Sequence, residues 1–343
     1  MDVEQEEKER FQQVYEVLKK DVLEDPAFEH DDVSLQWVQQ MMDYNVPGGK
    51  QSRAMLVIES LKRLKDGKPV SEEEFFRASV MGWCIQWAMA SALMQDDIVD
   101  NSNMRRGKPC WFRLPKVGLI ALNDSTLLGC QAGRIAKKHF RDQPYYRDYV
   151  DLISEIGFQT ISGQMIDLIT EGEKDIWQFN MTLHQRISLY KTAYGTTYLP
   201  FACALLMLGE KVEDFVDAKD ILLEMGIYFQ VQDDYLDCFG DPEKMGKVGT
   251  DIEESKCSWL VVKALELCDE EQKKILVENY MKSDQESVAI VKCLYKDLNL
   301  EGVYAEYEAN LYEKLIGRIE AIPNTNVRKL LKSYLDKIYL RQK

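Results

Sequence analysis

Turn-forming residues are scarce in this chain of 343 residues, which has nine prolines and 19 glycines. Both counts lie below the usual share of these residues in globular proteins. An all-β sandwich or barrel needs a turn every few residues, so this scarcity excludes that class of fold. Hydrophobic residues make up 45% of the chain and aromatic residues 10%. That composition supplies ample core material and excludes wholesale disorder.

An excess of basic charge is also missing. Lysine and arginine number 43 against 58 aspartates and glutamates, which gives a formal net charge of −15. A nucleic-acid binder needs a basic face to neutralise phosphates, so the charge excludes that class of partner. It does not exclude small phosphorylated ligands that are held through metal ions.

Membrane-spanning and targeting patterns are absent as well. No run of 18 or more uncharged apolar residues occurs, so we expect no membrane span. The acidic, polar start at residues 1–7 resembles neither a signal peptide nor an arginine-rich transit peptide. The eight cysteines include no C-x-x-C pair, which favours a reducing compartment without a zinc site. We therefore expect a cytoplasmic protein.

Helical periodicity runs through almost the whole chain. Apolar residues recur in steps of three and four, and residues 71–74 form a capping-box pattern. The predicted helices are 5–24, 31–44, 51–66, 71–100, 117–139, 146–171, 178–208, 211–238, 253–268, 270–284, 285–298, 301–321 and 324–341. No linker, composition shift or repeat interrupts them. We therefore predict an all-α helical bundle in a single domain over 1–343, with a central active-site cavity.

Two acidic motifs each follow an apolar helical stretch. The first acidic motif is Asp-Asp-Ile-Val-Asp at 96–100, and the second is Asp-Asp-Tyr-Leu-Asp at 233–237. On a helix the first and fifth residues share a face, and like charges at that spacing repel each other. Carboxylate oxygens without nearby histidine or cysteine suit Mg²⁺ that also binds substrate phosphate. One such motif could be a solvated acidic face, but two copies favour a metal-dependent site.

Basic residues that could bind diphosphate stand close to these motifs in the sequence. We expect Lys50 and Arg53 to share a face in the first turn of a helix after Gly48-Gly49, a typical anion site. Further candidates are Arg105, Arg106, Lys191, Lys247 and Lys256. Each could instead be a solvated surface charge. The three histidines lie outside all these segments, so we expect no catalytic role for them.

Eight ordered motifs resemble the farnesyl diphosphate synthases of animals, within the trans-isoprenyl diphosphate synthase family. In order they are 47–53, 96–100, 105–107, 163–167, 190–192, 229–237, 246–251 and 256–259. The resemblance covers nearly the whole chain and is highly specific. The basic end at 337–343 also resembles the family's C-terminus, which closes over the homoallylic diphosphate.

The resemblance implies a Mg²⁺-dependent prenyltransferase. It implies metal ligands at Asp96, Asp97, Asp100, Asp167, Asp233, Asp234 and Asp237. Three Mg²⁺ ions, with Mn²⁺ able to substitute, would neutralise an allylic diphosphate, which departs to leave an allylic cation. The implied partners are prenyl diphosphate substrates and a second copy of the chain in a homodimer.

The resemblance also implies roles for the basic and polar residues. The allylic diphosphate would bind Arg105, Lys191, Lys247 and Lys256. Isopentenyl diphosphate would bind Lys50, Arg53, Arg106 and Arg341. The Lys191 carbonyl, the Thr192 hydroxyl and Gln230 would face the allylic cation and, with Arg105, form the catalytic set.

The sequence departs from the family around the expected chain-length pocket. Met89, Ser91 and Ala92 replace bulky or polar residues of the family, as does Thr197 near Gly195. Ala54 replaces a glycine. Ala88 and Ala92 lie on the expected metal-binding face, so the pocket would be deep. Two function classes remain open. One is a transferase with an altered length of prenyl product or substrate, and the other is a terpene synthase on the same scaffold. The protein could be a diverged paralogue of the family. Both intact acidic motifs argue against an inactive binding protein.

Overall fold

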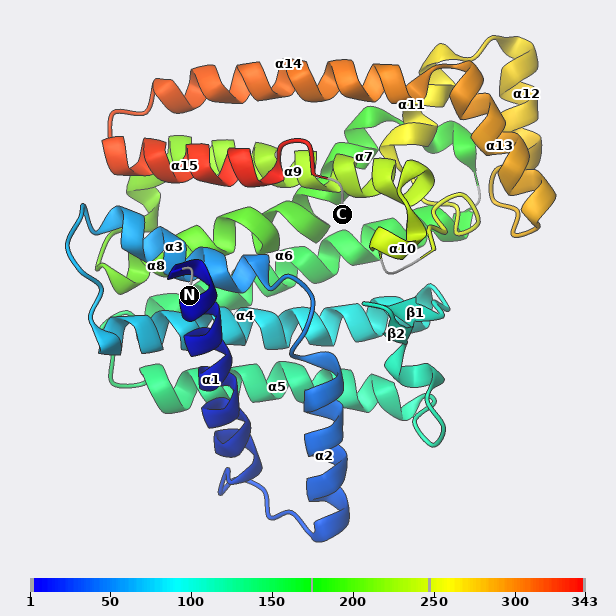
Figure 1. The fold of residues 1–343 in the computed structure, drawn as a ribbon. Helices are drawn as coiled ribbons and strands as arrows, with labels where there is room; N and C mark the ends of the chain where they lie inside the picture. Colours follow the sequence, from blue (N-terminus) through cyan, green and yellow to red (C-terminus); the bar gives the residue numbers. More distant parts are fainter. Residues whose placement is uncertain (1–2, 174, 246–247, 342–343) are drawn as a thin grey trace. The chain divides into compact units, whose positions relative to one another are not determined.

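The computed structural model describes residues 3–173, 175–245 and 248–341, and in these ranges the regular structure is almost entirely helical (Figure 1). The chain divides into two compact units. Unit 1 comprises Met1–Asp151 and Pro200–Val212, and unit 2 comprises Leu152–Leu199 and Glu213–Lys343. The predicted all-α fold class is confirmed, while the single domain and its central cavity stay predictions.

Unit 1 is built around one long helix. Its elements are α1 (Val3–Leu23), α2 (Asp32–Asn45), α3 (Ser52–Leu64), α4 (Glu72–Val99), β1 (Met104–Arg105), β2 (Lys108–Pro109), η1 (Trp111–Arg113), α5 (Ile120–Phe140), the start of α6 (Tyr146–Glu173) and most of α8 (Leu199–Met207). The helix α4 is apolar on nearly all sides, as a helix surrounded by others must be. It contacts α1, α3 and α5.

Local sequence explains why α4 begins and packs where it does. The side chain of Ser71 accepts a hydrogen bond from the Glu74 N–H, and Glu74 bonds back to the Ser71 N–H, which confirms the predicted capping box. At Gly82 a Cβ atom would lie 2.6 Å from the Ala54 carbonyl oxygen. Only glycine therefore allows α3 and α4 to approach so closely, and the stacked rings of Phe11 and Trp83 fill the core beside them.

Unit 2 carries the remaining elements. They are the rest of α6, η2 (Ile176–Gln178), α7 (Met181–Ile187), η3 (Ser188–Tyr198), the last residues of η4 (Val212–Phe215), α9 (Val216–Phe239), α10 (Pro242–Met245), α11 (Trp259–Leu267), α12 (Glu270–Asn279), α13 (Gln285–Asp297), α14 (Leu300–Glu320) and α15 (Thr325–Ile338). Helices α14 and α15 each contact α9. A buried cluster around Trp259, Tyr295 and Leu300 forms the core beneath α11 and α13.

The segment η3 is a π-helix of 11 residues, a wide helical form that occurs mostly as single turns at functional sites. Glycines allow its neighbours to press against it. A Cβ atom at Gly163 of α6 would lie 2.3 Å from the Lys191 nitrogen, and one at Gly226 of α9 would lie 2.5 Å from Ala193 Cα. The π-helix is thus held between α6 and α9 at backbone distance.

The observed elements correct four details of the predicted secondary structure. The helix predicted over 253–268 begins only at Trp259, because Ser255 has φ +66° and Ser258 caps the new helix. The helix predicted over 270–284 ends at Asn279. The helix predicted over 178–208 changes to π geometry from 188 to 198. The short antiparallel pair β1–β2 was not predicted, because strands of two residues leave no pattern.

No helix within the described ranges combines the length and the apolar content needed to cross a membrane.

Candidate active site

The first acidic motif occupies the C-terminal end of α4, where Asp100 caps the helix. Its first and fifth residues, Asp96 and Asp100, are half-buried one turn apart, while Asp97 is 4% exposed. A helix C-terminus carries partial negative charge, which adds to the repulsion between the carboxylates. A positive charge is therefore needed to stabilise this end of the helix.

Arg105 supplies part of that charge from strand β1. Its Nε donates to Asp97 Oδ1 at 2.7 Å, and its Nη2 lies 2.6 Å from the same oxygen and 3.6 Å from Asp96 Oδ2. Burial alone would lower the pKa of Arg105, but the charges of Asp97 and Asp96 raise it overall. Burial, followed by the charge and hydrogen bond of Asp97, raises the pKa of the Cys110 thiol to about 12. Asp97 therefore positions Arg105 and is buried in this structure, and its role as a metal ligand stays a prediction.

The second acidic motif lies in the last turns of α9, and its first residue is partly exposed. The Asp233 side chain is 41% exposed and forms an ion pair with Arg341, which follows α15. The Arg341 guanidinium carbon also lies 3.8 Å from the centre of the Phe229 ring, one turn before Asp233. Asp237 accepts the Asp251 N–H at 3.0 Å. Arg341, predicted to bind isopentenyl diphosphate, is thus paired with a metal-motif carboxylate here.

Asp234 is buried and its carboxylate is saturated by protein donors. Its Oδ2 accepts the Trp259 backbone N–H at 2.7 Å and lies 2.8 Å from His184 Nε2, and its Oδ1 accepts Gln230 Nε2 at 2.9 Å. With both oxygens engaged, Asp234 joins α7 and α11 to α9, and its role as a metal ligand stays a prediction.

His184 was therefore missed by sequence reasoning. It is 2% exposed and its ring contacts the second acidic motif, although the histidines were expected to have no role. The available signal was weak, namely its position seven residues before Lys191. Only the packing of α7 against α11, which carries Trp259, reveals the contact.

A chain of two hydrogen bonds joins the π-helix to the second acidic motif. The Thr192 hydroxyl donates to Gln230 Oε1 at 2.7 Å, and the Gln230 amide donates to Asp234 Oδ1 at 2.9 Å. These two bonds therefore fix both the orientation of the Gln230 amide and the direction of the Thr192 proton. The structure brings these two residues into contact, and their catalytic role stays a prediction.

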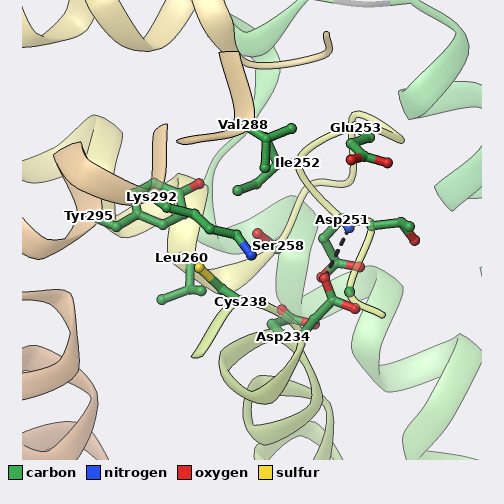
Figure 2. A pocket seen from close by; sticks show the side chains of 13 residues that line it. Asp234, Cys238, Asp251, Ile252, Glu253, Ser258, Leu260, Val288, Lys292 and Tyr295 are labelled. Carbon is green, nitrogen blue, oxygen red and sulfur yellow. Dashed lines mark hydrogen bonds between the residues drawn. The ribbon is translucent and has the colours of Figure 1, made fainter. Parts of the chain in front are cut away.

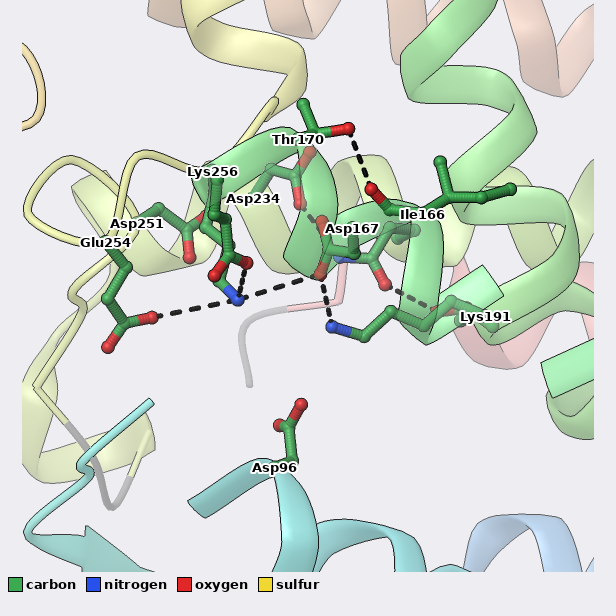
Figure 3. Close-up of polar contacts among 12 residues, drawn as sticks. Asp96, Ile166, Asp167, Thr170, Lys191, Asp234, Asp251, Glu254 and Lys256 are labelled. Carbon is green, nitrogen blue, oxygen red and sulfur yellow. Dashed lines mark hydrogen bonds and ion pairs between the residues drawn. The ribbon is translucent and has the colours of Figure 1, made fainter. Parts of the chain in front are cut away.

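Asp167 on α6 lies between two lysines (Figure 3). Lys191 Nζ donates to Asp167 Oδ2 at 2.6 Å, and Lys256 Nζ lies 3.6 Å from the same oxygen. Lys256 also pairs with Glu171 and lies 4.0 Å from Glu254. Lys256 is thus neutralised by acids on two segments, and Lys191 reaches Asp167 from the π-helix. Lys247 lies outside the described residues.

Three basic residues predicted to bind isopentenyl diphosphate belong to unit 1. The helix α3 begins at Ser52 after Gln51 in left-handed geometry, so Lys50 precedes the helix rather than sharing its first turn with Arg53. The turn before it uses Gly48 and Gly49, whose φ values are +102° and +66°. A Cβ atom on Gly49 would lie 3.1 Å from Arg106 Nε.

Arg106 is held against this turn. Its Nη1 donates to the carbonyls of Asn45 at 3.1 Å and Pro47 at 3.3 Å. Burial and the charge of Arg105 lower the pKa of Arg106, while Asp97 opposes that shift. A nearby anion, such as a diphosphate, would stabilise the protonated form of Arg106 that its present surroundings disfavour.

The predicted chain-length residues do not behave as one group. Ala88 and Ala92 of α4 are exposed, and Met89 and Ser91 are half-buried. Ser91 faces α5, where a Cβ atom at Gly129 would lie 3.5 Å from its Oγ. Thr197 is buried and donates to the Leu222 carbonyl at 2.6 Å. Thr197 therefore belongs to the contact between the π-helix and α9, and its role in the chain-length pocket stays a prediction.

The comparisons with known proteins cover nearly the whole chain. The sequence model of the family described as "Polyprenyl synthetase" matches residues 35–298. The chain belongs to this family. It is 60% identical to "Farnesyl pyrophosphate synthase 1" of Lupinus albus over 97% of this chain and 98% of that protein. It is 61% identical to the Cannabis sativa protein of the same name, over 98% and 99%.

Solved structures agree with this assignment. A structure titled "T. Brucei Farnesyl Diphosphate Synthase Complexed with Risedronate" superposes with a TM-score of 0.93 at 34% identity, covering 98% of this chain and all of that one. This member of the polyprenyl synthetase family is a short-chain trans-prenyltransferase, and the terpene synthase alternative is not favoured. The sequence relatives are plant proteins, whereas the motifs had suggested an animal one.

The family depends on divalent metal ions, and the carboxylates of this prenyltransferase fit that dependence. In the described ranges no three His, Cys, Asp or Glu side chains converge on one point. Mg²⁺ commonly takes only one or two protein carboxylates and completes its shell with water and substrate phosphate. Asp96 and Asp100 in one unit, and Asp233 in the other, offer such partial ligand sets.

A small cavity lies behind the second acidic motif of this prenyltransferase (Figure 2). Its volume of about 10 Å³ is close to what one water molecule requires. Asp237, Asp251, Lys292 and Tyr295 contribute to its lining. The buried Tyr295 hydroxyl has no hydrogen-bond partner among the described residues. The cavity thus suits a buried water, not a substrate.

Proposed function

We propose that this chain condenses an allylic diphosphate with isopentenyl diphosphate to form farnesyl diphosphate or a longer prenyl diphosphate. The observation that carries the proposal is identity of about 60% over nearly the full length to farnesyl pyrophosphate synthases. The geometry supports it because the two acidic motifs and the basic turn at 47–50 provide sites for two diphosphates. A lyase acting on a single diphosphate would need no second basic site.

Three Mg²⁺ ions are the proposed metal complement, with Mn²⁺ able to substitute. Asp96, Asp100 and Asp233 would hold them, since these carboxylates are partly exposed. Asp167 would join after exchanging an ion pair with Lys191 or Lys256. Bound ions would neutralise the diphosphate and make it a better leaving group.

The cations around the motifs would bind the allylic diphosphate. Arg105 is already oriented by Asp97, so little side-chain entropy would be lost when it contacts a phosphate oxygen. Lys191 would turn from Asp167 toward the diphosphate, as would Lys256. The same role is proposed for Lys247.

The allylic cation formed on ionisation would face oxygen atoms of the π-helix. Because the Thr192 proton is directed at Gln230, the lone pairs of the Thr192 hydroxyl remain available to the cation. The Lys191 carbonyl would contribute a second negative dipole. Such fixed dipoles stabilise developing charge without reorganisation.

Isopentenyl diphosphate would bind Lys50, Arg53, Arg106 and, after its release from Asp233, Arg341. Its double bond then attacks C1 of the allylic cation, and a new carbon–carbon bond forms. The resulting tertiary cation loses a proton from the adjacent carbon, which restores a double bond. The departed diphosphate is the proposed acceptor of that proton.

We also propose a homodimer in the cytoplasm. A stripe on α6 exposes four large apolar side chains: Phe158 at 74%, Ile161 at 71%, Met165 at 53% and Ile169 at 55%. A contiguous apolar face of this kind favours association, and a second copy of the chain would cover it. Phe158→Glu should shift the dimer to monomer in analytical ultracentrifugation. The compartment needs its own test by microscopy, since one relative is named mitochondrial.

The decisive experiment supplies Mg²⁺ with dimethylallyl, geranyl or farnesyl diphosphate, each with and without isopentenyl diphosphate. We expect isopentenyl diphosphate to be consumed in proportion to a longer prenyl diphosphate. A hydrocarbon or alcohol formed as the main product from one prenyl diphosphate alone would overturn the proposal.

A further inference from the structure

A carboxylate outside both acidic motifs is buried in unit 1. Asp124 on α5 is 1% exposed. Its hydrogen-bond partners in the described part of the chain are two indole groups: Trp37 Nε1 donates at 3.0 Å and Trp111 Nε1 at 2.9 Å. A buried charge held by neutral donors is costly compared with an apolar residue. One buried carboxylate thus joins two separate indole groups, which an apolar side chain could not do.

The two indoles belong to different elements. Trp37 lies on α2, and Trp111 begins η1 directly after strand β2. Their rings meet edge to face with centroids 6.1 Å apart. Each indole has one N–H donor with a fixed direction, so Asp124 sets the position of both α2 and η1 relative to α5.

The β1–β2 hairpin, which directly precedes η1, also contacts α2. The Tyr44 hydroxyl of α2 donates to the Pro109 carbonyl of β2 at 2.7 Å. Arg106, between β1 and β2, donates to the Asn45 and Pro47 carbonyls at the end of α2. The β1–β2 hairpin is therefore attached to α2 at one end and to Asp124, through Trp111, at the other.

We propose that Asp124 is a positioning residue for the proposed condensation, fixing Arg106 against the turn at 47–50. The inference rests on the proposed function, because it assigns that turn and Arg106 to isopentenyl diphosphate. Without the Asp124 bonds, the hairpin and the end of α2 would shift independently. Small misplacements of binding groups reduce activity strongly even when the chemistry is untouched.

The test compares Asp124→Asn and Trp111→Phe with the unaltered chain in steady-state assays that vary each substrate. An asparagine can face one indole N–H with its oxygen but presents a second donor to the other. We expect the KM for isopentenyl diphosphate to rise about tenfold, the effect of losing one hydrogen bond of ordinary strength. The kcat and the KM for the allylic substrate should change less than threefold.

Gln131→Leu is the matched control. Gln131 lies on the same helix and accepts the buried Trp87 indole N–H at 3.2 Å, away from the hairpin. It should lower the melting temperature as Asp124→Asn does while leaving the KM for isopentenyl diphosphate unchanged.

Two outcomes would overturn the inference. One is an unchanged KM for isopentenyl diphosphate in Asp124→Asn and Trp111→Phe, and the other is an equal rise in the Gln131→Leu control. If either variant does not fold, Trp37→Phe is measured in the same assay, because it removes only the hydrogen bonding between α2 and Asp124. Failure of the proposed function is distinguishable, since the unaltered chain would then not consume isopentenyl diphosphate at all.

Discussion

The two acidic motifs have the same pattern of aspartates but different charge partners. In the first, the buried Asp97 pairs with the cation Arg105, which also lies near Asp96. In the second, the buried Asp234 is held by a backbone N–H, an amide and His184, and the cation Arg341 pairs with the exposed Asp233 instead. Identical spacing on a helix therefore does not determine where the positive charge lies.

This difference suggests a division of labour. The first motif carries its own cation on the short β1–β2 hairpin, so its positive charge stays in place before substrate binds. The second motif receives its cation, Arg341, from the segment that follows α15. We infer that Arg341 occupies part of the metal-binding surface of Asp233 until ligands displace it.

The largest expected effect comes from removing one exposed carboxylate in each motif. Asp96→Asn and Asp233→Asn each keep the size of the side chain but remove a metal ligand, so turnover should fall by about a hundredfold or more. Asp220→Asn, an exposed position earlier on α9, is the control and should retain full activity. Near-normal turnover in either motif variant, or activity in excess chelator, would contradict the metal mechanism.

A smaller effect should separate the two buried aspartates. Asp97→Asn leaves Arg105 without its nearest counter-charge and should lower the free energy of unfolding by roughly 3 kcal/mol. Asp234→Asn weakens hydrogen bonds to a backbone N–H, an amide and His184 and should cost about 1–2 kcal/mol.

Urea denaturation of both variants measures this difference. The double variant Asp97→Asn with Arg105→Gln should recover part of the loss, because the uncompensated cation is gone. Equal losses in the two single variants would show that the different partners have no energetic consequence.

Arg341→Gln tests whether the cation of the second motif is exchangeable. Without substrate, Mg²⁺ should bind the variant about threefold to tenfold more tightly, because the positive charge beside Asp233 is removed. The KM for isopentenyl diphosphate should rise at the same time. Isothermal titration and steady-state kinetics measure the two changes, with Arg328→Gln on α15 as control. Unchanged metal affinity would mean that Arg341 does not compete for Asp233.

Substitutions one helical turn before each motif should change the rate least, but they should change the length of the product. Phe229 precedes Asp233 and stacks with Arg341, whereas the exposed Ala92 precedes Asp96. Each helical turn rises about 5.4 Å, close to the length of one isoprene unit. Ala92→Phe should therefore shorten the longest product by at least one unit, as measured by chromatography of the dephosphorylated products.

Adding Ser91→Phe should not shorten the product further. Because Ser91 faces Gly129 on α5, the larger ring would overpack that contact and lower stability by about 1–3 kcal/mol. A stable double variant with a still shorter product would show that Ser91 lines the pocket after all.

Much of the local structure follows from the sequence. The capping box at Ser71, the all-α class and the position of both acidic motifs at helix ends are confirmed, because each depends on residues within one or two turns. The family followed from the order of the motifs. The π-geometry of η3 depends on contacts with other helices and could not be predicted. The late start of α11 has local causes, the positive φ of Ser255 and the cap at Ser258, which the apolar pattern did not reveal.

The sequence by itself determined which residues share a helix face, and so which aspartates point together. Only the tertiary structure decided which partner each one meets. Asp97 and Asp234 have the same local sequence position, yet one meets an arginine eight residues away and the other a histidine 50 residues away. Helix periodicity is a short-range property of the backbone, whereas charge pairing is set by packing, which joins residues that no local pattern connects.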